Sequence, residues 1–167
     1  MASNLKNLSE YSSKNIIKVE DYTFGIVVAE WNEAITLPLL EGAVNTLVNN
    51  GAKKENIIIK TVAGSFELSL ASQWLAQEQD IDAVIALGCV IQGETKHFDF
   101  ICQAVANGIT NVGLKYDKPV IFGVLTTDNL EQAQERSGGK HGNKGDEAAI
   151  TAIKMLGIRE KKGIWDF

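Results

Sequence analysis

The chain carries AVIALGCVI at residues 83–91, and this apolar run passes directly into QGETKHFD at residues 92–99. A continuous apolar run is typical of a strand that is buried on both faces of a parallel sheet. Open α/β sheets bind their ligands at the carboxyl ends of such strands. There, Gly93 lets backbone N–H groups approach a ligand, Thr95 adds a hydroxyl group, and His97 can transfer a proton near neutral pH. An ordinary turn that caps a helix explains the local sequence equally well, so the rest of the chain decides.

Three further apolar runs are predicted to be fully buried strands of the same sheet. They cover Phe24–Ala29, Ile57–Val62 and Val120–Leu125. Together with the run at Ala83–Val90, they start about one βαβ unit apart, which is typical of parallel strands joined by crossover helices.

The segments between and after these runs carry the apolar spacing of amphipathic helices. The first helix contains residues 40–48, and it either begins near Leu37 or is capped by Asn32 and kinked at Pro38. This alternation predicts an α/β fold, a three-layer αβα sandwich around a four-stranded parallel sheet. The remaining helices are predicted at Phe66–Gln79, at Phe98–Tyr116, and at Asp146–Leu156, where Gly157 closes the helix.

Residues 14–158 are predicted to form one domain, between a flexible N-terminal arm at residues 1–13 and a C-terminal tail at residues 159–167. Near the start of the domain, Asn15–Glu20 is a strand-like segment with no helix to return it. Such a segment can pair with a sheet edge, its own or a neighbour's. We expect it to add a strand to the sheet of a neighbouring subunit.

Composition and charge exclude several classes of protein. Apolar residues make up 45% of the chain and charged residues 22%, as in soluble globular proteins. The net charge of −5 and the lack of a basic stripe argue against nucleic-acid binding. No secretory signal or membrane span is recognisable, so no membrane partner is expected. Cys89 and Cys102 lack zinc-ligand spacing, and we expect free thiols in a reducing cytoplasm.

The other strand ends supply side chains that suit a planar, polar heterocycle. Trp31 follows the first run and offers a flat aromatic face. Ser65, Phe66 and Glu67 follow the second run, where N–H groups at a helix start and a carboxylate can bind polar ring edges. Taken alone, each of these residues is more often structural. Because the carboxyl ends of parallel strands meet at one sheet edge, their convergence favours a binding site.

A glycine-rich stretch, RSGGKHGNKG at residues 136–145, follows the fourth run. A solvated turn between helices explains its glycines, but it does not explain why an otherwise acidic chain gathers cations there. Arg136 can bind a phosphate group through charge-assisted hydrogen bonds, which are about twice as strong as neutral ones. Neither GxxxxGK[ST] nor GxGxxG occurs, so neither NTP hydrolysis nor dinucleotide binding is indicated.

From Phe24 to Gly157 the chain resembles the 6,7-dimethyl-8-ribityllumazine synthases of riboflavin biosynthesis. Four motifs carry the resemblance: GSFE at residues 64–67, GETKHFD at 93–99, PVIFG at 119–123 and GNKG at 142–145. Their order and spacing make the match specific, although each motif alone is weak. The resemblance implies a transferase that condenses 5-amino-6-(ribitylamino)uracil with 3,4-dihydroxy-2-butanone 4-phosphate and releases phosphate and water.

The resemblance also implies a pyrimidine pocket. Trp31 stacks on one face of the ring, and Phe122, reached from an adjacent subunit, covers the other. The polar ring edge and the ribityl chain are held by Ser65, Phe66 and Glu67. The same pocket is lined by the backbone of Cys89, Val90 and Ile91.

For the second substrate, the resemblance implies that Glu94 and Thr95 cradle the phosphate group and that Arg136 supplies its cation. Because a carboxylate repels a phosphate dianion, we expect Glu94 to contribute its backbone N–H and to turn its side chain away. His97 is the proton shuttle, and Lys144 matches a family lysine near the site. No cofactor and no metal is implied.

The family assembles into pentamers, and sometimes into icosahedral shells of twelve pentamers, so the resemblance implies a homo-oligomer with riboflavin synthase as a further candidate partner. Two other readings compete with the enzyme. A flavodoxin-like module that binds FMN would use the same fold, but it leaves His97 and Arg136 unexplained. A structural shell protein is the other, and that role can coexist with catalysis.

Overall fold

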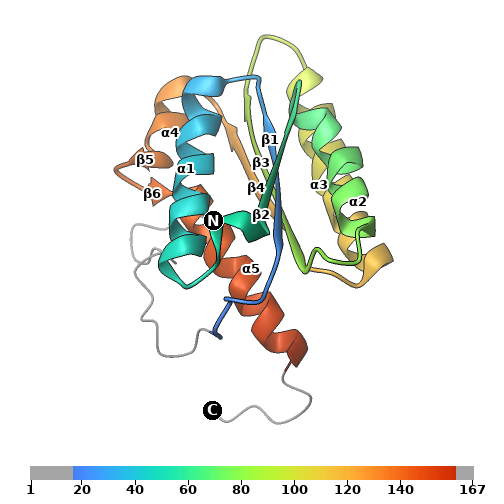
Figure 1. The fold of residues 1–167 in the computed structure, drawn as a ribbon. Coiled ribbons are helices and arrows are strands. Elements are labelled where there is room, and N and C mark those ends of the chain that lie inside the picture. The colour runs from blue at the N-terminus through green and yellow to red at the C-terminus, as the bar shows by residue number, and fades with distance from the viewer. Residues whose placement is uncertain (1–16, 161–167) are drawn as a thin grey trace.

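Four parallel strands form the central sheet, in the order β2-β1-β3-β4 (Figure 1). The structure is a computed structural model, and it describes residues 17–160. The prediction of a four-stranded parallel sheet is therefore confirmed. The strands are β1 Phe24–Ala29, β2 Ile57–Val62, β3 Ala83–Ile91 and β4 Val120–Thr127.

Helices cover both faces of this sheet, as expected for a three-layer sandwich. α1 (Glu33–Asn49) and α5 (Lys144–Glu160) pack together on one face, and α2 (Leu68–Gln77) and α3 (His97–Tyr116) pack on the other (Figure 1). Short elements complete the chain: the 3-10 helices η3 Lys54–Asn56 and η4 Ser65–Glu67, the helix α4 Leu130–Gln134, and the antiparallel hairpin of β5 Ser137–Gly139 and β6 Gly142–Asn143.

The core consists of two apolar layers that β1 and β3 separate. Ile26 and Val28 of β1 pack into the layer under α1 and α5, while Val27 and Ala29 pack into the layer under α2 and α3. Successive side chains of a strand point to opposite faces, so a central strand needs apolar residues at every position. This requirement explains why the β1 and β3 sequences are uninterrupted apolar runs.

The first helix begins directly after Asn32 and contains Pro38, so the second of the two predicted starts is right. Asn32 itself adopts a left-handed conformation, with φ 63°, and its side chain does not cap the helix. Proline lacks the N–H that would bond to the carbonyl one turn earlier. At the same place the Pro38 carbonyl accepts a hydrogen bond from Asn143 Nδ2 at 2.8 Å, which ties α1 to the start of α5.

The prediction that all four strands are fully buried is wrong for β2. Every residue of β2 is half-buried or exposed, including Ile58 and Ile59. The strand lies at an edge of the sheet and pairs only with β1. An apolar run therefore identified the strand but not its place in the sheet, because strand order depends on how the crossovers wind. The other edge strand, β4, is also partly exposed, at Phe122 for example.

The last helix is longer than predicted, because it continues past Gly157 to Glu160 and so includes Arg159 of the expected tail. A Cβ atom at Gly157 would lie 3.2 Å from Ile17 Cγ2, so this glycine allows close packing instead of ending the helix. Of the strand-like segment at Asn15–Glu20, the described residues 17–20 form no strand, and Val19 is buried in the core. Residues 15–16, the arm at 1–13 and residues 161–167 lie outside the described range.

Candidate functional site

The loops that follow β1, β2 and β3 enclose a cavity of about 360 Å³. This volume falls in the range of small-molecule sites, and its place at the carboxyl ends of parallel strands is where α/β sheets bind ligands. The structure thus brings together most of the side chains that the sequence predicted for one site. The lining residues are Trp31, Asn32, Gly64, Ser65, Phe66, Glu67, Cys89, Val90, Ile91, Gly93, Thr95, His97, Phe98 and Ile101.

Trp31 stands at the mouth of this cavity with 72% of its surface exposed. Its backbone N–H donates to the Ala63 carbonyl at 3.0 Å, which extends the β1–β2 pairing beyond the strands. The next residue, Asn32, donates from Nδ2 to the Cys89 carbonyl at 2.9 Å and so joins the ends of β1 and β3. The sequence indicated Asn32 only as one of two alternatives for the helix start, as a cap, and did not indicate this role. The only sequence signal for this role was the residue type: asparagine tolerates the left-handed region of backbone conformation, and this one stands between a strand and a helix.

The loop after β2 is held by its own side chains. Ser65 is buried, and a Cβ atom on Gly88 of β3 would lie 2.7 Å from Ser65 Oγ, so the glycine makes room for the serine. Glu67 Oε2 accepts a hydrogen bond from the Gly64 N–H at 3.1 Å and caps the helix start. A carboxylate accepts at both oxygens, so Glu67 can cap this turn and still accept a hydrogen bond from a ligand.

The loop after β3 ends at the N-terminus of α3, where His97 is the first helical residue. Thr95 Oγ1 accepts a hydrogen bond from the His97 N–H at 3.3 Å and so satisfies one of the free N–H groups at the helix start. Its hydroxyl proton remains able to donate to a ligand. The side chain of His97 is exposed on the cavity wall, whereas Glu94 is exposed and does not line the cavity. Free N–H groups at a helix N-terminus favour a bound anion.

Cys89 contributes a neutral side chain to the cavity wall. Burial raises the pKa of its thiol to about 11, so the sulfur carries no charge near neutral pH. Burial also raises the pKa of the Cys102 thiol, with a further contribution from the charge of Asp99. Both cysteines are free thiols. A buried neutral thiol suits packing against a ring better than nucleophilic attack.

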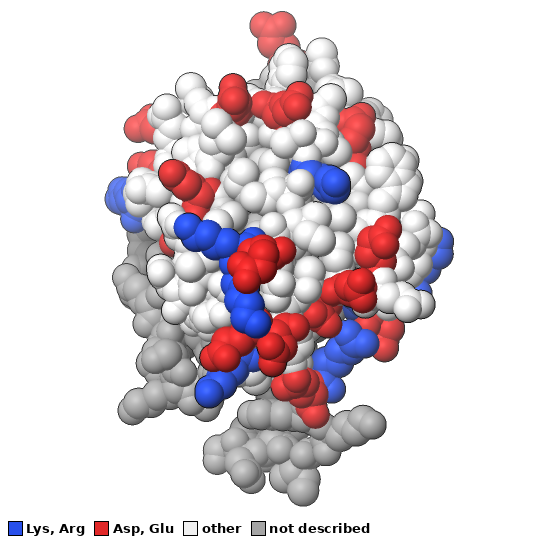
Figure 2. Space-filling model, in the orientation of Figure 1, with Lys and Arg blue, Asp and Glu red and all other residues white. Residues whose placement is uncertain are grey.

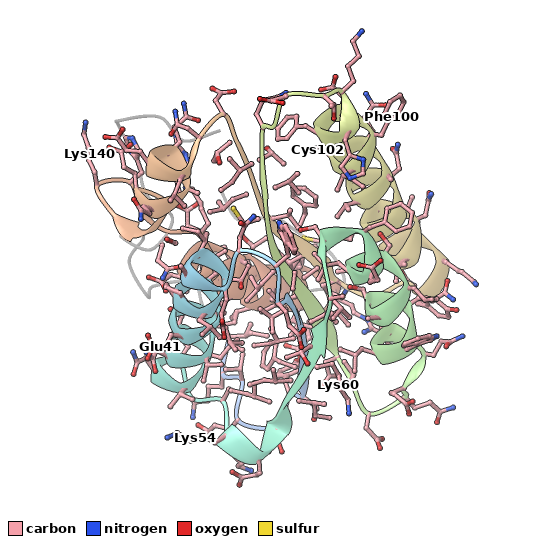
Figure 3. All side chains as sticks on the ribbon, turned by 90° about the horizontal axis from the view of Figure 1, so that it is seen from above. Glu41, Lys54, Lys60, Phe100, Cys102 and Lys140 are labelled. Carbon is pink, nitrogen blue, oxygen red and sulfur yellow. The ribbon has the colours of Figure 1, made fainter. Side chains whose placement is uncertain are left out.

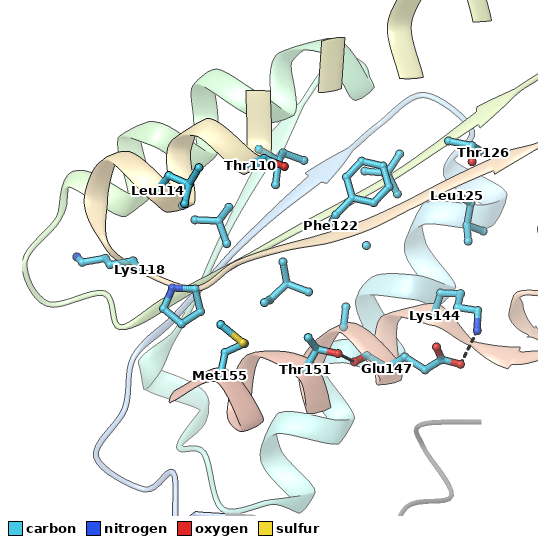
Figure 4. A pocket seen from close by; sticks show the side chains of 18 of the residues that line it. Thr110, Leu114, Lys118, Phe122, Leu125, Thr126, Lys144, Glu147, Thr151 and Met155 are labelled. Atoms are coloured by element: carbon cyan, nitrogen blue, oxygen red, sulfur yellow. Dashed lines mark hydrogen bonds and ion pairs between the residues drawn. The ribbon is translucent and has the colours of Figure 1, made fainter. Parts of the chain in front are cut away.

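Phe122, Arg136 and Lys144 lie apart from this cavity. They line a second hollow, a groove of about 1060 Å³ that runs over β4 between α3 and α5 (Figure 4). Seen from above, the hairpin tip with Lys140 and the start of α3 near Phe100 lie on opposite sides of the molecule (Figure 3). The single chain therefore does not bring Arg136 to Thr95, although the sequence predicted that both bind one phosphate group.

Arg136 and Lys144, two of the four cations that line the groove, are each held by a neighbour. Arg136 Nη1 donates to the Gln132 carbonyl at 2.8 Å, and Lys144 Nζ forms a half-buried ion pair with Glu147 (Figure 4). On the face shown in Figure 2, acidic side chains prevail along the upper edge, where the strands end, and both signs mix lower down. The lining residues of the cavity include no lysine or arginine, so the N-terminus of α3 is its main source of positive potential.

No helix within residues 17–160 is long and apolar enough to cross a membrane.

Comparison with known proteins gives one consistent result. The family model described as 6,7-dimethyl-8-ribityllumazine synthase matches residues 21–160. A 6,7-dimethyl-8-ribityllumazine synthase from Cytophaga hutchinsonii is 67% identical over 156 residues, which cover 93% of this chain and 98% of that protein. Those from Parabacteroides distasonis and Porphyromonas gingivalis are 54% and 53% identical, over 93% and 95% of this chain and 98% of each protein.

Proposed function

This chain belongs to the 6,7-dimethyl-8-ribityllumazine synthase family, and from this premise we propose that the cavity at the ends of β1, β2 and β3 is its substrate site. The enzyme is a transferase of riboflavin biosynthesis. It joins the amine of 5-amino-6-(ribitylamino)uracil to 3,4-dihydroxy-2-butanone 4-phosphate and releases phosphate and water. The product is 6,7-dimethyl-8-ribityllumazine. The observation that carries the assignment of the site is the gathering of side chains from three strand ends in one cavity.

In this proposal, the pyrimidine lies against Trp31, whose exposed ring offers a stacking face. Ser65, Phe66 and Glu67 hold its polar edge and its ribityl chain. Because the Ser65 side chain is buried against Gly88, its contribution to the ligand comes from the backbone. Cys89, Val90 and Ile91 line the floor, the first of them as an uncharged thiol.

His97 moves the protons of the condensation. Schiff-base formation, loss of phosphate and loss of water each require a proton transfer, and histidine does this in both directions near neutral pH. The phosphate group binds at the start of α3, where Thr95 donates its hydroxyl and Glu94 its backbone N–H. The exposed Glu94 carboxylate does not line the cavity, which agrees with a side chain that turns away from the anion.

The site is completed by a second copy of the chain, which supplies Phe122, Arg136 and Lys144. Two observations support this proposal. These residues share one groove and lie apart from the cavity. Exposed apolar side chains also lie at both edges of the sheet, at Ile59 of β2 and at Phe122 of β4.

A contact between two different edges is head-to-tail, and such contacts form a closed ring when the rotation between neighbours closes. A ring of five subunits is the assembly that we propose. Because Val19 packs in the core of its own chain, any part of the Asn15–Glu20 segment that is added to the neighbouring sheet comes from residues ahead of Val19. Twelve such rings form the larger shell. In support of the shell, the connection from α4 to α5 is only a short hairpin, and we infer that it carries no insertion that would separate these helices and block the packing of pentamers. Riboflavin synthase is a candidate partner of the shell. The free thiols are consistent with a cytoplasmic location.

Mixing the protein with both substrates tests the function directly. We expect lumazine fluorescence to appear only when both substrates are present and to grow with enzyme concentration. Omitting either substrate is the control. If the protein makes no lumazine and carries a stoichiometric flavin in its visible spectrum, then a flavin-binding module is the better description.

Light scattering in phosphate buffer near neutral pH tests the assembly. We expect a particle with the mass of a 60-subunit shell, and smaller species when residues 1–16 are deleted. The deletion must stop before Val19, because Val19 is fully buried and its loss would damage the chain itself. A wild-type mass near five subunits that added phosphate does not change would rule the shell out, and an active monomer would rule out the shared site.

A further inference from the structure

The second of the chain's two histidines, His141, lies in the hairpin between Arg136 and Lys144 and lines neither the cavity nor the groove. We propose that His141, together with Glu135, is a positioning residue that holds Arg136 in place for the phosphate-bearing substrate. This inference rests on the role of Arg136 in the proposed function.

His141 contacts Glu135 twice. Its backbone N–H donates to the Glu135 carbonyl at 2.8 Å. Its imidazole Nε2 lies 3.5 Å from Glu135 Oε2, within ion-pair distance, and the two side chains are only 20% and 31% exposed. The backbone and side-chain contacts join the same two residues, so they fasten the hairpin to the end of α4 at one point.

This fastening point is next to Arg136 in the chain. The Arg136 N–H donates to the Ala133 carbonyl at 3.1 Å, and the Arg136 carbonyl accepts from the Lys144 N–H at 2.9 Å. With the bond from its guanidinium to the Gln132 carbonyl, Arg136 is fixed at both its backbone and its side chain. Of these bonds, the one from the Lys144 N–H joins the two ends of the hairpin and requires that it stay folded, whereas the other two hold Arg136 to the end of α4.

One further side chain joins the hairpin to the end of α4, since Ser137 Oγ donates to the Gln134 carbonyl at 3.3 Å. Gly138 and Gly142 have positive φ values of 120° and 73°, so its backbone uses conformations that only glycine adopts freely and that carry a large entropy in the unfolded chain. Gly139 lets the hairpin backbone pack closely against Glu135, since a Cβ atom at this position would lie 2.8 Å from Glu135 Cα. At the base of the hairpin, Asn143 pairs with Ser137 and donates from Nδ2 to the Pro38 carbonyl of α1. The His141–Glu135 contact folds the tip of the hairpin back onto the residue that precedes Arg136.

Steady-state kinetics of the intact enzyme test this proposal. His141→Ala should raise KM for the butanone phosphate roughly three- to tenfold, as expected for loss of one polar contact, and should leave kcat and KM for the pyrimidine within about twofold. Glu135→Gln should have the same effect, and His141→Gln, which keeps a donor near the carboxylate, should restore most of the affinity. Thermal unfolding of each variant checks that the fold is retained.

Lys140→Ala is the matched control, because Lys140 is the neighbour of His141 in the hairpin and its exposed side chain points away from the fold (Figure 3). It should leave KM nearly unchanged. An equal rise in this variant would mean that the charge of the hairpin matters and that the contact with Glu135 does not, and it would overturn the proposal.

A double-mutant cycle separates positioning from other roles. In an Arg136→Ala background, His141→Ala should add less than about twofold to KM, because its effect acts through the missing guanidinium. If Arg136→Ala raises KM and the effects of the two substitutions on KM multiply in full, then His141 does not act through Arg136. That result would overturn the positioning role of His141 and leave the role of Arg136 intact. An Arg136→Ala enzyme with unchanged KM would remove the role proposed for Arg136 and this inference with it.

Discussion

Replacing His97 with alanine should slow the condensation on the order of 10²- to 10⁴-fold, the range that positioned acid–base catalysis contributes. The change removes the imidazole from the cavity wall but leaves the backbone N–H that binds Thr95 Oγ1, so the start of α3 should keep its shape. Binding of the pyrimidine, measured by titration without the second substrate, should be nearly unchanged. Single-turnover kinetics with both substrates measure the loss in the chemical steps.

His97→Gln is the matched control for this prediction. Glutamine keeps a polar side chain of similar reach, but it cannot carry a proton between steps. It should therefore be about as slow as alanine. A glutamine variant that turns over at the wild-type rate would show that His97 only orients the substrate, and a wild-type rate in His97→Ala would remove it from the mechanism.

The sequence was sufficient to locate the cavity because its residues follow strands whose apolar runs are unambiguous. β1 and β3 are central strands, so apolar residues fill both faces, and the polar residues begin where the strands end. The rule that parallel strands end at one edge then placed Trp31, Glu67 and His97 together. No contact between distant residues had to be known for this step.

Other features depended on contacts that a single sequence does not reveal. Gly157 has the local signature of a helix end, but it serves the approach of Ile17, which is far away in the chain. Asn32 has the signature of a cap, but its side chain reaches Cys89 of β3. The Ile57–Val62 run has the composition of a buried strand, yet β2 is an edge strand of the described chain. In each case the tertiary structure gives the residue or strand a role that differs from the one its local sequence predicts.

Two impaired variants should restore activity to each other if the site is shared between subunits. Arg136→Ala should raise KM for the butanone phosphate roughly 10- to 100-fold, because a charge-assisted contact to the phosphate group is lost. In the proposed ring, His97 of one subunit works with Arg136 of the next. An Arg136→Ala chain still offers an intact His97, and a His97→Ala chain still offers an intact Arg136.

Co-expression of these two chains in equal amounts should therefore give rings in which about one quarter of the sites combine both intact residues. At a low concentration of the butanone phosphate, the mixed enzyme should approach about a quarter of the wild-type rate, while each parent remains far below it. Co-expression of His97→Ala with Trp31→Ala is the control, because both residues line the cavity of one chain and no mixed site is intact. If the first mixture recovers no more activity than this control, then Arg136 and His97 do not meet across a subunit boundary. Recovery of about a quarter of the wild-type rate requires a shared site. Every chain in the mixture carries one of the two substitutions, so a site built from one chain alone would always be defective.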